Sequence, residues 1–295
     1  MKRRAGYILA AGVLAGCVQP APIPPPPSPA PVQEPPRPAQ PVRAEFEIEG
    51  QLSQGGLIVG RAPSNAVGLT LDGKPVRLDG DGRFVIGFDR DQSARSVLTA
   101  TLADGRTATR ALVVAPRAWD IEHVGIARRP GGASEDYLRI REGELARINA
   151  ARAVDSPAGG WRQDFIWPAT GRISGRFGSQ RIYRGEPGSY HSGVDVAPGA
   201  GAPVVAPADG MVVLAGPPMF SLEGNLVIID HGMGLNSAFL HLAQVNVRQG
   251  QSVRQGQSIG TVGSSGRATG PHLHWSVKWN DARLDPQLLA GPMAR

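Results

Sequence analysis

The chain has 295 residues, of which 41% are hydrophobic and 19% are charged, so it is long enough for about two folded domains with ordinary cores. Aromatic residues are sparse (5%) and the 39 glycines are spread along the chain, which favours short strands and turns and argues against a mainly helical protein. The formal net charge is only +6, and no basic cluster interleaved with aromatic residues accompanies it, so nucleic-acid binding is not expected.

Residues 1–16 are typical of a signal peptide, because basic residues precede an apolar run that is too short to span a bilayer. The run ends in Leu14-Ala15-Gly16-Cys17, which resembles a bacterial lipoprotein box. The resemblance implies that Cys17 becomes lipidated and anchors the protein in a membrane. Because Val18 follows rather than Asp, the expected location is the outer membrane, facing the periplasm. The alternative is a secreted protein with an incidental thiol.

A proline-rich segment from residue 17 to 45 is predicted to form an extended, semi-rigid tether. Residues 46–117 contain short alternating segments broken by Asp-Gly turns, which predicts a small antiparallel, sandwich-like β domain. The spacing from Gly68 to Lys74 imitates a phosphate-binding loop, but Pro75 stands where Ser or Thr should bind magnesium, so a hairpin is predicted. The Asp-Gly cluster at 79–82 lacks the spacing of a calcium loop and is predicted to be a turn.

Residues 118–160 are predicted to form a connector that contains a helix. Apolar residues recur at helical spacing in its second half, namely Leu138, Leu145 and Ile148. From residue 161 to 295 the chain returns to short strands separated by glycine turns. The whole chain is therefore expected to be mainly β, with a small antiparallel domain, a connector helix and a second all-β domain.

Five of the six histidines fall between residues 191 and 274. In an extended backbone His191 and Asp195 point to the same side, and so do His272 and His274, while His241 lies between two leucines that point away from it. A set of two histidines and one aspartate matches a catalytic zinc site, whereas magnesium and calcium prefer oxygen ligands. Copper and iron remain chemical alternatives.

Zinc at such a site would give a hydrolase. A base of the His-Glu-x-x-His type is missing from the sequence. The histidines that do not bind the metal are therefore candidates for proton handling and oxyanion stabilisation. The competing interpretation is that the histidines are only structural, and the paired pattern on clean strand faces makes it the weaker one.

These segments resemble the lysostaphin/LytM-type zinc peptidases, peptidase family M23, over roughly residues 167–286. The likeness rests on three histidine segments and three turns: His191–Asp195, His241-Leu242, Gly270–His274, Ala206–Gly210, Asp230–Gly232 and Val253–Gly260. It implies that one zinc ion is bound by His191, Asp195 and His274. It also implies that His241 and His272 are catalytic, with the choice of the base left open. His231 and His123 are expected to be structural.

Members of this family cut peptides of bacterial peptidoglycan. The resemblance therefore implies a zinc-dependent endopeptidase that hydrolyses cross-link peptide bonds, with the D-alanyl–diaminopimelate bond as the expected target. The alternative is a non-catalytic relative that binds the cell wall or activates an amidase, but such relatives usually lack site residues that are all present here. A lipoyl-type carrier is disfavoured because Lys278, the only lysine of this domain, lies beside Trp279 rather than at a hairpin tip. The first domain could also cover the site.

Overall fold

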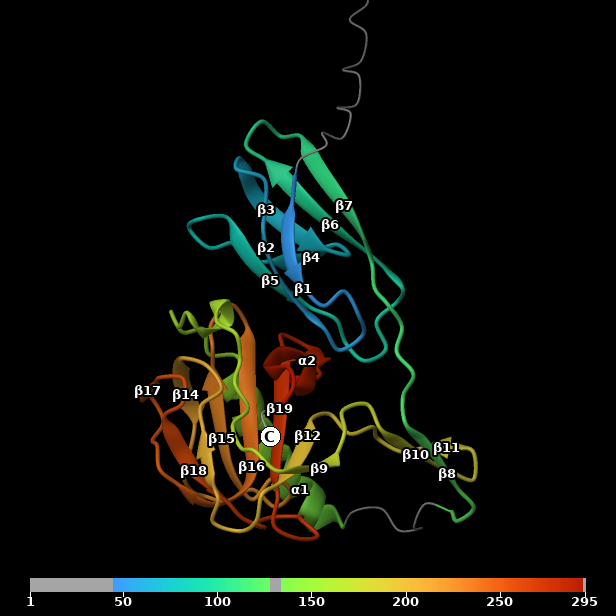
Figure 1. The fold of residues 1–295 in the computed structure, drawn as a ribbon, viewed down its shortest axis with the longest axis vertical. Coiled ribbons are helices and arrows are strands. Elements are labelled where there is room, and N and C mark those ends of the chain that lie inside the picture. Colours follow the sequence, from blue (N-terminus) through green and yellow to red (C-terminus); the bar gives the residue numbers. More distant parts are fainter. Residues whose placement is uncertain (1–44, 128–133, 294–295) are drawn as a thin grey trace, which may run out of the picture. The chain divides into compact units, whose positions relative to one another are not determined.

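The computed structural model describes residues 45–127 and 134–293 (Figure 1). The predicted signal peptide, the lipidation site Cys17 and most of the proline-rich segment lie outside the described residues. In the described ranges the chain is mainly β, as the sequence predicts, with strands assembled into four sheets. No helix within these ranges is both long enough and apolar enough to cross a membrane.

The N-terminal β region (residues 46–117) consists of two antiparallel sheets. The first has the strand order β1-β2-β5 and contains β1 (Glu47–Gly50), β2 (Leu57–Arg61) and β5 (Arg83–Gly87). The second has the order β4-β3-β6-β7 and contains β3 (Ala66–Leu71), β4 (Lys74–Val76), β6 (Arg95–Leu102) and β7 (Thr107–Val113). The predicted hairpin is confirmed, because Asp72 and Gly73 form the turn between β3 and β4. Apolar side chains such as Phe84, Ile86 and Leu98 are fully buried in this region.

The connector contains a strand as well as the predicted helix. Strand β8 (Ile121–Val124) pairs in parallel with β10 (Gln180–Tyr183), which also pairs with β11 (Glu186–Pro187). Helix α1 (Glu135–Arg152) begins after Ser134, whose hydroxyl accepts a hydrogen bond from the Tyr137 N–H at 3.2 Å. Such a cap satisfies a backbone donor that has no partner inside the helix.

The predicted helix is confirmed, but its three apolar residues are not equally buried. Ile148 is buried, whereas Leu138 and Leu145 are 56% and 42% exposed. The buried positions are Glu144, Ile148 and Ala151. Ile148 and Ala151 pack on apolar side chains of the large sheet, whereas the preceding turn of the helix makes polar contacts. The reason for the difference is therefore that an ion-pair cluster takes the place of apolar packing there.

The C-terminal β region (residues 161–293) contains the large sheet. Its main path runs in the order β17-β14-β15-β16-β19-β12-β9, β18 pairs with β13 and β16, and β20 pairs with β19. The strands are β9 (Arg172–Gly175), β12 (Val194–Ala197), β13 (Pro203–Val205), β14 (Gly210–Leu214), β15 (Asn225–Asp230), β16 (Leu235–Val245), β17 (Ser252–Val253), β18 (Ser258–Val262), β19 (Leu273–Trp279) and β20 (Ala282–Leu284). A short helix, α2 (Pro286–Ala290), follows the sheet. Leu273, Trp275 and Val277 are fully buried, so one face of β19 is committed to the core.

The two β regions contact each other directly. Leu284 is fully buried, and a Cβ atom added to Gly87 would lie 2.7 Å from its side chain, so only glycine fits at that point of β5. Arg117 donates to Asp285 at 2.7 Å, and the Asp285 carboxylate also accepts from the Gln287 N–H at the start of α2. One continuous apolar core includes side chains of both regions, so the packing does not mark a boundary between them. The domain boundary expected at residue 117 stays a prediction.

Candidate metal centre

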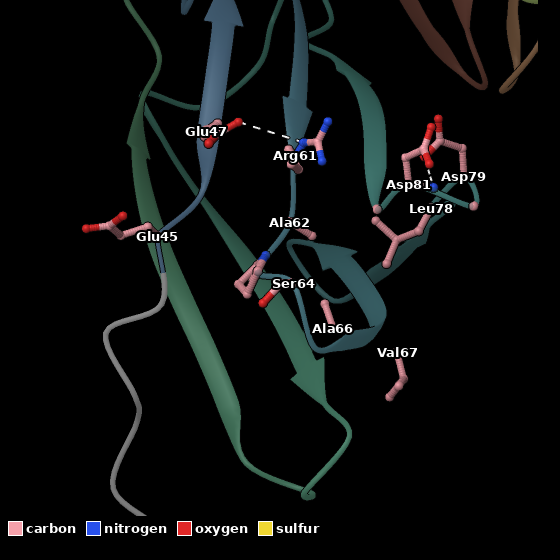
Figure 2. Close-up of a pocket in the computed structure, with 13 residues that line it drawn as sticks. Glu45, Glu47, Arg61, Ala62, Ser64, Ala66, Val67, Leu78, Asp79 and Asp81 are labelled. Atoms are coloured by element: carbon pink, nitrogen blue, oxygen red, sulfur yellow. Dashed lines mark hydrogen bonds and ion pairs between the residues drawn. The ribbon is translucent and has the colours of Figure 1, made fainter.

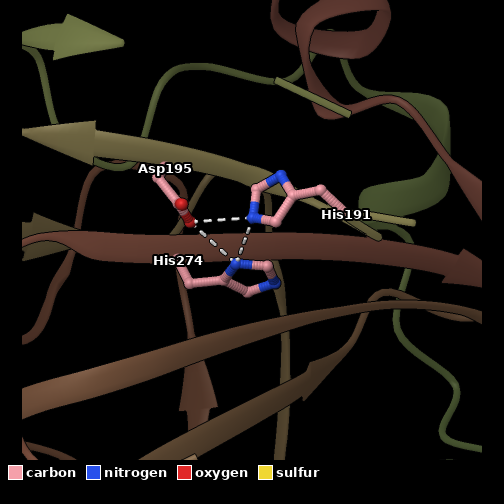
Figure 3. Close-up of side chains that lie close together, drawn as sticks. All are labelled: His191, Asp195 and His274. Carbon is pink, nitrogen blue, oxygen red and sulfur yellow. Dashed lines mark hydrogen bonds and ion pairs between the residues drawn. The ribbon is translucent and has the colours of Figure 1, made fainter. Parts of the chain in front are cut away.

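Three of the candidate side chains converge on one point of the large sheet. Asp195 on β12 lies directly opposite His274 on β19, and His191 precedes β12 in the loop after β11. The Nε2 atom of His191 lies 3.1 Å from Asp195 Oδ1 and 3.1 Å from His274 Nδ1, and His274 Nδ1 lies 2.8 Å from Asp195 Oδ1 (Figure 3). Three ligand atoms of the kinds expected from the sequence therefore form a compact triangle.

The triangle fits a divalent cation. Tetrahedral zinc with ligands at about 2.0–2.1 Å places neighbouring ligand atoms about 3.3–3.4 Å apart, close to the separations found here. The Nδ1–H of His191 donates to the backbone carbonyl of Arg176 at 3.1 Å, so its Nε2 presents a lone pair to the Asp195 carboxylate. Two acceptors at this distance repel each other unless a proton or a cation lies between them. The same carbonyl contact fixes the tautomer of His191, as is usual for metal-binding histidines.

Two glycines allow the three ligands to approach one another. A Cβ atom at Gly193 would lie 2.5 Å from the carbonyl oxygen of Trp275 and 2.7 Å from His274 Nε2. A Cβ atom at Gly175, which pairs with Asp195 in the sheet, would overlap the Asp195 carboxylate. The space that Gly193 leaves open is therefore filled by the His274 ring.

The protonation states of Asp195 and His274 suit metal binding. Burial raises the pKa of Asp195, but its contacts with His191 and His274 outweigh this effect and hold that pKa well below the usual range. Burial lowers the pKa of His274. For His191 burial also acts to lower the pKa, but the Asp195 carboxylate more than offsets it, so the pKa is raised. The cluster therefore keeps an ionised carboxylate beside a His274 imidazole that is neutral near pH 7.

The other two candidate histidines lie beside this cluster. The ring centroid of His241 is 4.9 Å from that of His272 and 6.4 Å from that of His274, and His272 Nε2 lies 3.8 Å from Asp195 Oδ1. The Nδ1–H of His241 donates to the carbonyl of Ser265 at 2.9 Å, and that of His272 donates to the carbonyl of Gly270 at 2.8 Å. Because Nδ1 carries the proton in both rings, each Nε2 atom keeps a lone pair.

The backbone at His241 departs from the strand alternation expected from the sequence. Its φ is +64°, in the left-handed region that non-glycine residues rarely adopt. The pairing of β15 with β16 is irregular here, because two steps from Asn225 to Val227 face three steps from Leu242 to Phe239. A β-bulge therefore sets the direction of His241, and bulges often direct a side chain next to an active site.

The remaining two histidines are placed differently. His231 is fully buried, its Nδ1–H donates to the carbonyl of Asp209 at 2.8 Å, and its Nε2 accepts from the Ser237 hydroxyl at 2.9 Å. Burial lowers the pKa of His231 to about 4. His123 is exposed on β8, which precedes all segments of the cluster in the sequence. Both observations agree with the structural roles expected for these residues.

A groove of about 1160 Å³ opens beside the cluster. His191, Asp195 and Gly175 line one part of it, and Leu222 and Arg267 line another. A third part comes from the connector, through residues 120, 122, 126 and 127. This last wall has no local signal in the sequence, because the parallel pairing of β8 with β10 joins segments about 60 positions apart.

A second, smaller hollow of about 600 Å³ lies in the N-terminal β region (Figure 2). Acidic residues dominate its polar lining, and two of them, Asp79 and Glu47, are already engaged. Asp79 accepts hydrogen bonds from the backbone N–H groups of Asp81 and Arg83 and pairs with Arg162 at 2.6 Å, while Glu47 lies 3.8 Å from Arg61. We assign no function to this hollow.

Comparison with known proteins agrees with the site geometry. The family model described as Peptidase family M23 matches residues 189–286, a range that contains the three candidate ligands and the two histidines beside them. A crystal structure from Pseudomonas aeruginosa that is named for peptidase M23 is 31% identical, covers 82% of this chain and 96% of its own, and superposes with a TM-score of 0.61. The chain belongs to peptidase family M23.

Curated relatives share the matched region but are longer proteins. The peptidoglycan DD-endopeptidase ShyA of Vibrio cholerae is 40% identical over 110 residues, which are 36% of this chain and 24% of that protein. The lipoprotein NlpD/LppB homolog of Pseudomonas aeruginosa is 39% identical over 138 residues, which are 46% of this chain and 42% of that protein. The matches therefore span between a quarter and about two fifths of these relatives.

Proposed function

We propose that this chain is a zinc-dependent endopeptidase that hydrolyses the cross-link peptides of peptidoglycan. The observation that carries the proposal is the triangle of His191 Nε2, Asp195 Oδ1 and His274 Nδ1, with two more imidazoles beside it. Membership of peptidase family M23 supports peptide hydrolysis. Similarity to ShyA, whose name gives peptidoglycan as its substrate, supports the choice of polymer.

In this proposal His191, Asp195 and His274 hold one zinc ion. Bound there, zinc lowers the pKa of a water ligand to about 7 and polarises the scissile carbonyl. His241 and His272 supply the acid–base chemistry, because each keeps Nδ1–H fixed on a backbone carbonyl and presents Nε2. One of these two atoms accepts the proton of the attacking water. The other ring, when protonated, donates a hydrogen bond to the developing oxyanion.

The groove suits a peptide that is part of a polymer. Its volume of about 1160 Å³ exceeds the ~300–1,000 Å³ of common small-molecule pockets. The bond that we propose is the D-alanyl–diaminopimelate cross-link, and the DD-endopeptidase named among the relatives supports this choice. Such a bond joins two strands of the wall, so cleavage would open the network.

We also propose that the protein works in the cell envelope, held by lipid on Cys17 at the outer membrane. The sequence ending in Cys17 and the similarity to a relative named as a lipoprotein support this location. We expect labelled palmitate to be incorporated into the wild-type protein and not into Cys17→Ser. Equal labelling of the two proteins would overturn the anchor.

The decisive experiment for the activity is mass spectrometry of the muropeptides released when the purified protein meets cross-linked sacculi. We expect cross-linked dimers to decrease and monomers to increase, and we expect a zinc chelator and His272→Ala to abolish both changes. A protein that binds zinc and sacculi but leaves the dimers intact would instead support the non-catalytic wall-binding role.

A further inference from the structure

A buried ion-pair cluster joins helix α1 to the segment that precedes β15. The guanidinium of Arg141 forms two parallel contacts with the Glu223 carboxylate, at 2.7 Å from Nη1 to Oε2 and 2.6 Å from Nη2 to Oε1. Only 16% of the Arg141 side chain and 11% of the Glu223 side chain are exposed. Paired contacts of this kind fix geometry as well as adding energy.

Glu144, one turn further along α1, holds the same segment at a second point. Its carboxylate lies 2.9 Å from Arg141 Nη1, accepts from the Ser221 hydroxyl at 2.8 Å, and also accepts from the Ser221 backbone N–H. Burial raises the pKa of Glu144, but the contacts with Ser221 and Arg141 outweigh it, so the pKa is lowered and the group stays ionised. Residues 221–223 are therefore tied to the helix at both ends.

The other side of this segment supports His241. The backbone carbonyl of Glu223 accepts from the His241 N–H at 2.9 Å. The next residue, Gly224, has a φ of +69° and packs against Ser265 so closely that a Cβ atom would overlap it. The carbonyl of Ser265 in turn accepts from the His241 ring. The segment therefore contacts the backbone of His241 directly and its ring through Ser265.

His241 needs such support because its backbone conformation is unfavourable. A left-handed conformation at a non-glycine residue is strained and persists only where the surroundings enforce it. The ligand residues Asp195 and His274, in contrast, are held by the pairing of β12 with β19. A change at Arg141 can therefore disturb His241 without disturbing the ligand triangle.

We propose that Arg141 and Glu223 form a positioning pair that holds His241 in its working orientation and thereby sets the turnover rate. The inference rests on the proposed endopeptidase function and adds to it a control point that links Arg141, which lies outside the segment that matches the family model, to Glu223 within it. Loss of Arg141 leaves the Glu223 carboxylate buried without its partner, so the 221–224 segment shifts toward water and the His241 N–H loses its acceptor.

The helix itself does not depend on this pair for its attachment. Ile148 and Ala151 pack into the apolar cluster beneath α1. Arg147 donates to the carbonyl of Pro218 at 3.1 Å, and its guanidinium lies 4.4 Å from the centre of the Phe220 ring. We therefore expect substitutions of Arg141 to change the active site more than they change the docking of the helix.

The test compares full-length variants on a soluble cross-linked muropeptide dimer. We expect Arg141→Ala and the nearly isosteric Glu223→Gln to lower kcat by about 10- to 100-fold, the effect of a displacement near 1 Å in a catalytic group, with KM changed less than about threefold. Arg141→Lys keeps the charge but loses the paired contacts of the guanidinium, so its kcat should lie between that of the wild type and that of Arg141→Ala. The double variant should be no slower than the slower single variant.

Arg139→Ala is the matched control, because Arg139 lies on the same helix and pairs only with the exposed Asp136. It should leave kcat unchanged. Zinc content should stay at one ion per chain in all variants, and a crystal structure of Glu223→Gln should show the φ of His241 outside the left-handed region. This structural readout is independent of activity.

The outcomes separate this proposal from the one on which it rests. Wild-type activity together with unchanged kcat in Arg141→Ala and Glu223→Gln would overturn the positioning role and leave the endopeptidase in place. A loss of kcat that matches a loss of zinc or of folded protein would also overturn it. A wild-type chain that binds zinc and cleaves no dimer would overturn the endopeptidase and the positioning pair together.

Discussion

Two regions of the same sheet hold histidines in opposite ways. At the turn after β15, His231 is fully buried and both of its ring nitrogens have fixed partners, the carbonyl of Asp209 and the hydroxyl of Ser237. In the site beside the groove, His191, His241 and His272 each fix Nδ1 on a backbone carbonyl. Their Nε2 atoms remain available to a metal ion or a substrate.

We propose that a ring nitrogen without a fixed neutral partner distinguishes the metal-binding and catalytic histidines from the structural ones. Burial alone does not, because His241 is also only 7% exposed. Substitutions in the site beside the groove should therefore remove metal or activity, whereas substitutions at the turn should change stability.

The largest effect is expected from His274→Ala, which removes one of the three proposed metal ligands. Zinc content should fall well below one ion per chain, and cleavage of muropeptide dimers should fall at least about 1,000-fold, because metal catalysis supplies several kcal/mol. Metal analysis and product analysis on the same preparation measure both. Retention of zinc at wild-type affinity would mean that His274 is not a ligand.

His241→Ala should separate metal binding from catalysis. The ligand triangle stays intact, so we expect one zinc ion per chain and an unchanged melting temperature of the zinc-bound protein to within a few degrees. The rate should fall by about 100- to 10,000-fold, the usual contribution of general acid–base catalysis. If His241→Ala cleaved dimers at the wild-type rate, the catalytic role would move to His272 alone.

His231→Leu should lower stability rather than chemistry. The substitution leaves the carbonyl of Asp209 and the hydroxyl of Ser237 without their partner, which should reduce the free energy of unfolding at pH 7 by about 1–3 kcal/mol. Urea unfolding measures this loss, and zinc content serves as the control. A variant that keeps its stability and loses its metal would contradict the distinction between the two regions.

The same residue predicts a pH dependence of stability. The folded pKa of His231 is about 4, below the ordinary value of about 6.5, so the unfolded chain binds the proton more readily. Its contribution is complete above about pH 6.5 and is lost as the pH falls toward 4. Unfolding free energies should therefore decline more steeply from pH 7 to 5 in the wild type than in His231→Leu. Parallel declines would contradict the buried, neutral state of His231.

A smaller effect is expected from Arg90→Ala in the N-terminal β region. Arg90 is 6% exposed, donates to the carbonyl of Gly178 at 3.1 Å and to Gln180 at 3.0 Å, and lies 4.8 Å from the centre of the Tyr190 ring. Its loss should reduce the unfolding free energy by about 1–2 kcal/mol and leave kcat within a fewfold of the wild type. A rise in activity would instead support the idea that the first region restrains the site.

The smallest effect is expected from His123→Ala. This histidine is exposed on β8, so the unfolding free energy should change by less than about 0.5 kcal/mol and the zinc content should stay the same. The variant serves as the histidine control for the others. Loss of zinc from it would show that the metal lies somewhere other than the groove.

Local alternation in the sequence predicts which candidate side chains share a face. Leu273, Trp275 and Val277 commit one face of β19 to the core, which leaves His272 and His274 for the other face. Positions 191 and 195 are also an even number of residues apart, and the resemblance to a known family supplied the roles. The pairing of Asp195 with His274 had to come from the fold.

Other features had no local signal. Positive φ is usually a property of glycine, so nothing in the sequence marked the bulge at His241. Arg141 and Glu223 are 82 positions apart, and charges on a helix are usually solvated, so their pairing could not be predicted. The apolar spacing predicted helix α1, but it gave no sign that ion pairs hold the turn containing Arg141 and Glu144.

The most direct test of the central claim is zinc add-back to the metal-free protein with cross-linked sacculi as substrate. We expect no cleavage without metal, a rise in released monomers in proportion to the zinc added, and a plateau at one equivalent per chain. His274→Ala should show no such rise under the same conditions. Full cleavage by the metal-free protein, or none by the zinc-loaded wild type, would contradict the claim that His191, Asp195 and His274 hold a catalytic zinc ion.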